Sequence, residues 1–173
     1  NATQLAELSE TAKTIESVAG TRSLSHEPIA LDELVRSTVE TAAKTYGDAE
    51  IVLEHVPETT VSAGPHLETA VAELIENAIE HNGTESPTVA ISIEVCEETA
   101  TVTVTDNGPG IPAEEWAVVT GDTEISQLEH GSGLGLWLVR WVTENYGGEL
   151  TYYTHDSGST VAIMLPLVGT ATP

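Results

Sequence analysis

Apolar and polar residues alternate in several short stretches of the chain, and apolar residues recur every three to four positions in others. Alternation is the period of a strand and the longer spacing that of a helix. The pattern predicts helices at residues 1–19, 31–46, 65–82 and 134–146 and strands at 51–56, 60–63, 89–95, 101–105, 150–153 and 160–165. Strand pairs interleaved with helices predict an α+β fold, a two-layer α/β sandwich whose mixed sheet carries helices on one face.

The first predicted helix has the narrow apolar stripe of a coiled-coil seam, formed by Leu5, Leu8, Ala12, Ile15 and Ala19. Two heptads are equally compatible with an amphipathic helix that packs on its own domain. Gly20 and the polar residues up to Pro28 indicate a linker. The chain therefore divides into a helix at 1–19, a linker at 20–28, one domain at 29–167 and a short tail at 168–173.

The composition is strongly acidic, with 28 acidic and 5 basic residues and a formal net charge of −23. This charge argues against nucleic acid as a partner and against docking on anionic lipid, since both need a basic surface. The 40% of hydrophobic residues, placed periodically, argue against disorder. An acid-rich, lysine-poor composition resembles that of proteins from salt-loving archaea, where salt screens self-repulsion; an ordinary acidic domain is the alternative.

Cys96 is the only cysteine, so the chain forms no internal disulfide, which fits a reducing compartment. No apolar run approaches the roughly 18 residues of a membrane span, and we expect no signal peptide. We expect a cytoplasmic location, with or without membrane attachment of the full-length protein. Because the chain begins at Asn1, we expect it to be a fragment of a longer protein.

Glu73, Asn77 and Glu80 lie together beside the apolar stripe of the helix predicted at 65–82. Glu73 and Asn77 are four residues apart and therefore stack on successive turns. Their oxygens suit Mg²⁺, which prefers hard oxygen ligands and often shares its shell with substrate phosphates. A solvated helix face is the simpler alternative.

Asp106 ends a predicted strand with the same parity as Val102 and Val104, and so points toward the core. A carboxylate placed there needs hydrogen-bond donors, and an exocyclic amine is one. The turn that follows, residues 107–112, contains Gly108 and Gly110, which permit a sharp bend. An Asx-turn in which Asp106 caps its own loop is the alternative, with about equal weight.

A glycine-rich run, Gly131-Ser132-Gly133-Leu134-Gly135-Leu136, leads into the last predicted helix. Small residues let backbone N–H groups converge on an anion, and the helix N-terminus adds its dipole. The run lacks the Lys-Ser/Thr of a P-loop, and its glycines are wrongly spaced for a dinucleotide fingerprint. Taken alone, it is also compatible with a plain flexible loop.

In this order, the three segments ELIENAIEHN, DNGPGIP and GSGLGLWLV resemble the ATP-binding domain of sensor histidine kinases. The wider superfamily includes gyrase B, MutL and the large heat-shock chaperone ATPases. GGEL at 147–150 and the closing residues 158–166 extend the resemblance over about 29–167, and the residues around 128–141 are similar to haloarchaeal kinases. The resemblance implies the histidine kinase-like ATPase fold with Mg²⁺ and ATP bound, a response-regulator receiver domain as partner, and a homodimer in the full-length protein. Residues 1–19 would then be the end of its dimerisation hairpin.

The resemblance also implies roles for individual residues. Glu73 would assist phosphoryl transfer, Asn77 would bind Mg²⁺ and Asp106 would read the adenine amine. Residues 112–130 would form a mobile ATP lid, and His81 is expected to line the cleft. Further nucleotide contacts are expected at Gly108, Gly110, Ile111, Gly131, Ser132, Gly133, Leu134, Gly135, Leu136 and Thr160, the last near the adenine.

Two features depart from the family pattern. Glu80 stands where many kinases have Lys or Arg, and residues 45–139 contain no Lys or Arg at all. Phosphate charge must then be met by Mg²⁺, backbone amides and the helix dipole. The phosphoacceptor is also missing: His26-Glu27-Pro28 starts like the acceptor motif, but Pro28 comes too soon and disfavours a helix.

We therefore expect the γ-phosphoryl group to pass to a histidine upstream of this chain. Two alternatives remain at this point. One is a serine/threonine kinase that acts on an anti-sigma-antagonist-like protein, and the other is a degenerate nucleotide-binding module with a regulatory role.

Overall fold

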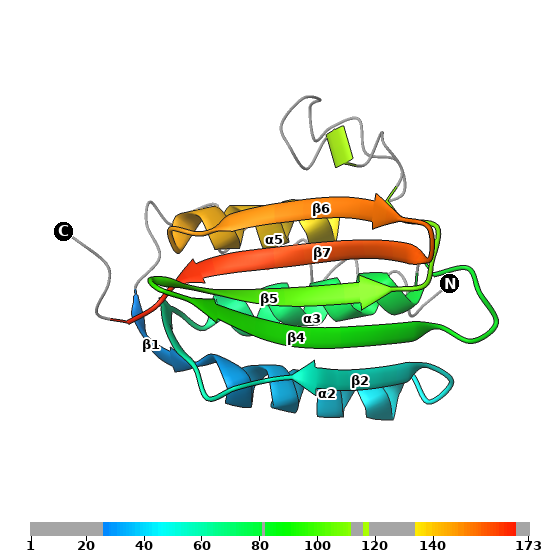
Figure 1. Ribbon diagram of the computed structural model, residues 1–173, viewed down its shortest axis with the longest axis horizontal. Coiled ribbons are helices and arrows are strands. Elements are labelled where there is room, and N and C mark those ends of the chain that lie inside the picture. Colours follow the sequence, from blue (N-terminus) through cyan, green and yellow to red (C-terminus); the bar gives the residue numbers. More distant parts are fainter. Residues whose placement is uncertain (1–25, 81, 112–115, 118–133, 169–173) are drawn as a thin grey trace.

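A five-stranded sheet in the order β2-β4-β5-β7-β6 forms the centre of the computed structural model, which describes residues 26–80, 82–111, 116–117 and 134–168 (Figure 1). The strand β2 runs parallel to β4, and the other neighbouring strands are antiparallel, so the sheet is mixed as predicted. The strands are β2 (Glu50–His55), β4 (Thr88–Cys96), β5 (Thr99–Asp106), β6 (Glu149–His155) and β7 (Gly158–Pro166).

Three helices cover one face of this sheet (Figure 1): α2 (Leu31–Thr45), α3 (His66–Glu80) and α5 (Leu134–Asn145). The middle helix, α3, contacts both α2 and α5. Within the described ranges, no helix is long and apolar enough to cross a membrane. The predicted α+β two-layer sandwich with helices on one face is confirmed.

The core lies between the sheet and the helices. Val89, Ile91 and Ile93 of β4 alternate toward it, and Ile75 of α3 is fully buried there. Burying each such aliphatic side chain contributes about 1.5–3 kcal/mol. The intervening strand residues, such as Thr103, point to the face that the helices leave uncovered, because side chains alternate along a strand.

One strand was not predicted. The strand β1 (Glu27–Ala30) pairs antiparallel with β3 (Thr60–Ala63) in a separate two-stranded sheet. The sequence pattern predicts a linker over residues 20–28, yet the structure pairs the chain from Glu27 onward. A four-residue strand that contains Pro28 is too short to show alternation, and proline is tolerated in a strand at an edge. The helix predicted at 1–19 lies outside the described residues.

Tyr146, directly after α5, contacts both the residue that precedes β1 and the first residue of α3. Its hydroxyl accepts a hydrogen bond from the His66 backbone N–H at 3.3 Å, and its ring meets the His26 ring edge-on with centroids 5.5 Å apart. Burial raises the pKa of the Tyr146 hydroxyl above its ordinary value of 10.0. His26 therefore sits against a buried aromatic ring just before β1, and it is not on a helix.

Candidate functional site

Glu73 and Asn77 lie where the start of α5 meets α3. A Cβ atom added to Gly135, the second residue of α5, would collide with the Glu73 Oε2 atom and lie 3.6 Å from Asn77 Nδ2. A larger residue at this position would require the Glu73 side chain to move. Glu73 and Asn77 are half-buried here, which disfavours a fully solvated helix face for these two residues. The polar edge of α3 and the end of the glycine-rich run therefore lie side by side.

Asp106 is the last residue of β5, and each of its carboxylate oxygens accepts a hydrogen bond. Its Oδ1 accepts the Gly108 backbone N–H at 2.8 Å, and its Oδ2 accepts the Ser159 hydroxyl at 3.0 Å. The Asx-turn considered as an alternative is therefore present, but the bond to β7 goes beyond a local cap. Each carboxylate oxygen has a further lone pair, so the group can still accept a hydrogen bond from an amine.

Ser159, and not Thr160, is the hydroxyl beside Asp106. The register pairs Asp106 with Ser159 and Thr105 with Thr160, so the first pair faces the helices and the second the uncovered face. The Thr160 hydroxyl lies 3.1 Å from that of Thr105 and 3.2 Å from His155 Nε2. The hydroxyl that contacts Asp106 is therefore that of Ser159, and the expected nearness of Thr160 to an adenine stays a prediction. Asp106 has the same strand parity as Val104 and therefore faces the helices. Ser159, its partner in the β5–β7 pair, faces the same way, and this pairing identifies Ser159.

The turn after β5 is also held by β6. The Ile111 backbone N–H donates to the Tyr152 hydroxyl at 2.7 Å, and Gly110 lies against the same hydroxyl. The Trp116 ring is 4.9 Å from the Tyr152 ring. Gly108 therefore lies against Asp106, whereas Gly110 and Ile111 lie against Tyr152 of β6.

Of the remaining predicted site residues, two lie in the described part of α5 and four lie outside the described residues. Leu136 is 3% exposed, and its side chain belongs to the core. Leu134 begins α5, which places its backbone at the helix N-terminus. His81, Gly131, Ser132 and Gly133 lie outside the described residues, as does the predicted lid apart from Trp116 and Ala117.

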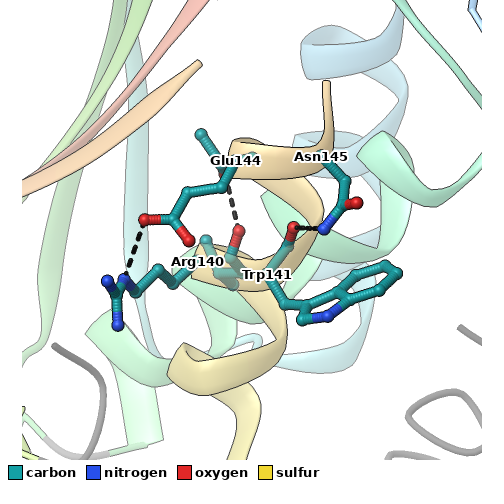
Figure 2. A network of polar contacts seen from close by, with 6 residues as sticks. Arg140, Trp141, Glu144 and Asn145 are labelled. Atoms are coloured by element: carbon teal, nitrogen blue, oxygen red, sulfur yellow. Dashed lines mark hydrogen bonds and ion pairs between the residues drawn. The ribbon is translucent and has the colours of Figure 1, made fainter. Parts of the chain in front are cut away.

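The bases in the described part of the chain pair with groups on their own or a neighbouring element. Arg140 Nε lies 3.1 Å from Glu144 Oε1 along α5 (Figure 2), and Lys44 Nζ lies 3.7 Å from Glu40 Oε1. Arg36 donates to the Val56 carbonyl oxygen at 3.0 Å. Glu80, where many kinases carry a base, accepts the Tyr46 hydroxyl at 2.7 Å.

Two carboxylates, an amide and the N-terminus of α5 thus lie on α3, β5 and α5, of which α3 contacts both of the others. Such a set can bind an amine through Asp106 and a metal-complexed anion at the start of α5. It offers no cationic side chain between residues 45 and 139 to an uncomplexed polyphosphate.

Comparisons with known proteins agree with this chemistry. Residues 62–169, more than half of the chain, match the family described as Histidine kinase-, DNA gyrase B-, and HSP90-like ATPase. The chain is 30% identical over 155 residues to the probable sensor histidine kinase TcrY of Mycobacterium tuberculosis, which covers 86% of this chain and 32% of TcrY. It is 31% identical over 124 residues to the sensor histidine kinase component HK1 of the same organism, covering 68% of this chain and 71% of HK1.

Among solved structures, histidine kinase ThkA in complex with the response regulator TrrA has a similar fold. The TM-score is 0.77 at 22% identity, over 96% of this chain and 49% of the matched chain. The chain spans only about a third of TcrY, so it corresponds to one part of such a protein. By sequence match and fold, the chain belongs to the histidine kinase-, DNA gyrase B- and HSP90-like ATPase family, as an ATP-binding domain of the sensor histidine kinase type.

Proposed function

We propose that the chain binds Mg·ATP between the sheet and the helices α3 and α5. The adenine amine would bind Asp106, and Ser159 would take the place near the adenine that is predicted for Thr160 from the sequence. The phosphates would lie at the start of α5. The observation that carries this proposal is the approach of Gly135 to Glu73 and Asn77, which supports a shared site for the two motifs.

The donor chemistry fits Mg²⁺. The Asn77 side-chain oxygen is a hard ligand, and no three His, Cys, Asp or Glu side chains in the described ranges gather into a metal cluster. A Mg²⁺ ion would then be shared between Asn77, the nucleotide phosphates and water. When bound, the ion neutralises phosphate charge. Glu73, on the preceding turn of α3, would orient the attacking group and accept its proton, so catalysis would rest on positioning and electrostatics.

In the whole protein, the γ-phosphoryl group would pass to a histidine upstream of this chain, on the same or the partner subunit, and then to an aspartate of a response-regulator receiver domain. The names of TcrY and HK1 support the first step, and the complex of ThkA with TrrA supports the second by analogy. Residues 1–19 would end the dimerisation hairpin of a homodimer, residues 20–26 would link it to the ATP-binding domain, and 168–173 would be a tail. We place this domain in the cytoplasm of a salt-loving archaeon.

The test is a calorimetric titration of the chain with ATP and Mg²⁺ in about 2 M KCl, which screens the self-repulsion of a strongly acidic chain. Saturable binding without self-phosphorylation is expected. The Asp106→Asn variant should bind ATP more weakly and keep its circular dichroism spectrum. No binding by an intact fold would instead indicate a regulatory module that has lost the nucleotide.

A further inference from the structure

Two asparagine side chains join the end of α3 to the turn after β5. Asn82 Nδ2 donates to Asn107 Oδ1 at 2.7 Å and to the Ala78 carbonyl oxygen at 3.3 Å. Asn107 Oδ1 also accepts the Thr88 backbone N–H at 3.0 Å, and Asn107 Nδ2 donates to the Ser86 carbonyl oxygen at 3.3 Å. We call this pair, Asn82 with Asn107, the asparagine clasp.

Asn82, the buried residue of the clasp, makes all the hydrogen bonds that its side-chain amide can make. Asn82 is 2% exposed, and its Oδ1 accepts both the backbone N–H and the hydroxyl of Thr84. With two bonds donated and two accepted, every hydrogen-bonding position of the Asn82 amide is used. If one partner is removed, the buried amide keeps a donor or acceptor without a hydrogen bond. The cost of leaving that group unpaired exceeds the net value of one hydrogen bond.

A backbone contact reinforces the clasp. A Cβ atom added to Gly108 would lie 3.0 Å from both the Cα and the carbonyl oxygen of Asn82. The turn after β5 therefore packs directly on the chain that leaves α3. This packing and the amide pair are independent observations of the same close junction.

The clasp connects residues that neighbour the two halves of the proposed nucleotide site along the chain. Asn107 directly follows Asp106, and Ala78, which accepts from Asn82, directly follows Asn77. We propose that Asn82 and Asn107 are positioning residues that hold the adenine-binding turn at a set distance from the metal-binding turn of α3. One Mg·ATP molecule can then reach Asp106 and Asn77 at the same time. This inference rests on the proposed function.

The clasp should matter most for a ligand that spans both halves. Adenosine contacts only the adenine half, so the distance between the halves does not affect its binding. Mg·ATP must engage both, and a displacement of about 1 Å can cost up to about a hundredfold in such a site. Loss of the clasp should therefore weaken Mg·ATP more than adenosine.

The experiment compares Asn82→Ala and Asn107→Ala with the unmodified chain in high salt, by calorimetry with Mg·ATP and with adenosine. Each variant should bind Mg·ATP about tenfold more weakly and adenosine less than about threefold more weakly. The double variant should be no weaker than the weaker single variant, because the two residues act as one unit. Asn107 is exposed, so its variant provides the measurement if Asn82→Ala fails to fold.

Asn145→Ala is the matched control. Asn145 Nδ2 also donates to the carbonyl oxygen four residues earlier, that of Trp141 at 2.8 Å, at the end of α5 (Figure 2). Its loss should leave the ratio of the two affinities unchanged. A lowered melting temperature in the clasp variants with an unchanged ratio, or additive losses in the double variant, would overturn the clasp alone. Absence of Mg·ATP binding by the unmodified chain would overturn the proposed function together with the clasp.

Discussion

The adenine half and the phosphate half of the proposed site are built in opposite ways. Around Asp106, the backbone of Gly108 and the hydroxyl of Ser159 already occupy both carboxylate oxygens, and the clasp ties the same turn to α3. The phosphate half consists of Glu73, Asn77 and the start of α5, with no cationic side chain from residue 45 to 139.

One half of the proposed site is preorganised by hydrogen bonds within the protein, and the other half depends on ions that it takes from solution. The adenine half is held by hydrogen bonds between strands and turns, so its affinity should depend little on ions. The phosphate half would place the Glu73 carboxylate near the negative charge of the ligand, so its affinity should depend on Mg²⁺ and on salt. Variants and conditions that act on one half alone can test this division.

The largest effect is expected from Asn77→Ala. Without the amide oxygen, Mg²⁺ loses its protein ligand, and Mg·ATP affinity should fall by about a hundredfold or more, close to 2.7 kcal/mol. Adenosine affinity, measured in the same calorimeter, should not change. Asn77→Asp keeps an oxygen ligand and should retain Mg²⁺-dependent binding. Normal Mg·ATP binding by Asn77→Ala would contradict the assigned metal site.

Gly135→Ala should come next. The added Cβ collides with the flexible end of the Glu73 side chain and displaces this carboxylate from the start of α5, at a cost of about 1 kcal/mol. We expect a lower melting temperature and roughly tenfold weaker Mg·ATP binding, with adenosine binding retained. Gly47→Ala is the control, since no atom lies within 4 Å of its added Cβ. Equal melting temperatures for the two variants would show that α3 and α5 do not pack this closely.

Salt should separate the two halves without mutation. Raising KCl from about 0.1 M to about 2 M screens the repulsion between the acidic chain and the phosphates. Mg·ATP affinity should rise by several-fold, whereas a site lined by lysine and arginine loses affinity with salt. Adenosine carries no charge, and its affinity should vary by less than about twofold once the fold is intact by circular dichroism. A fall in Mg·ATP affinity would argue for an unrecognised cationic group.

The smallest effect tests the adenine half. Ser159→Ala removes one hydrogen bond to Asp106, worth about 1 kcal/mol, and should weaken Mg·ATP and adenosine about equally, by roughly fivefold. Thr160→Val removes the hydroxyl on the uncovered face and should leave both affinities unchanged. If Thr160→Val proves the more damaging for adenosine, the assignment of Ser159 is wrong.

Local pattern determined most of the secondary structure and the identity of the motifs. The strand at 60–63 has the predicted bounds, and the predicted helices at 31–46 and 134–146 end within one residue of α2 and α5. Periodicity and turn residues act between near neighbours, so the sequence alone carries that information. The order of the three motifs likewise indicated Asn77, Asp106 and Gly135 without any knowledge of their distances.

Tertiary structure decided the features that depend on how distant segments meet. A one-residue change of register turns a strand's side chains to the other face, so only the pairing of β5 with β7 distinguishes Ser159 from Thr160. The asparagine clasp joins the end of α3 to the turn after β5, and β1 gains its partner only when β3 lies beside it. No local pattern records these contacts, because each arises from packing between segments that are separated along the chain.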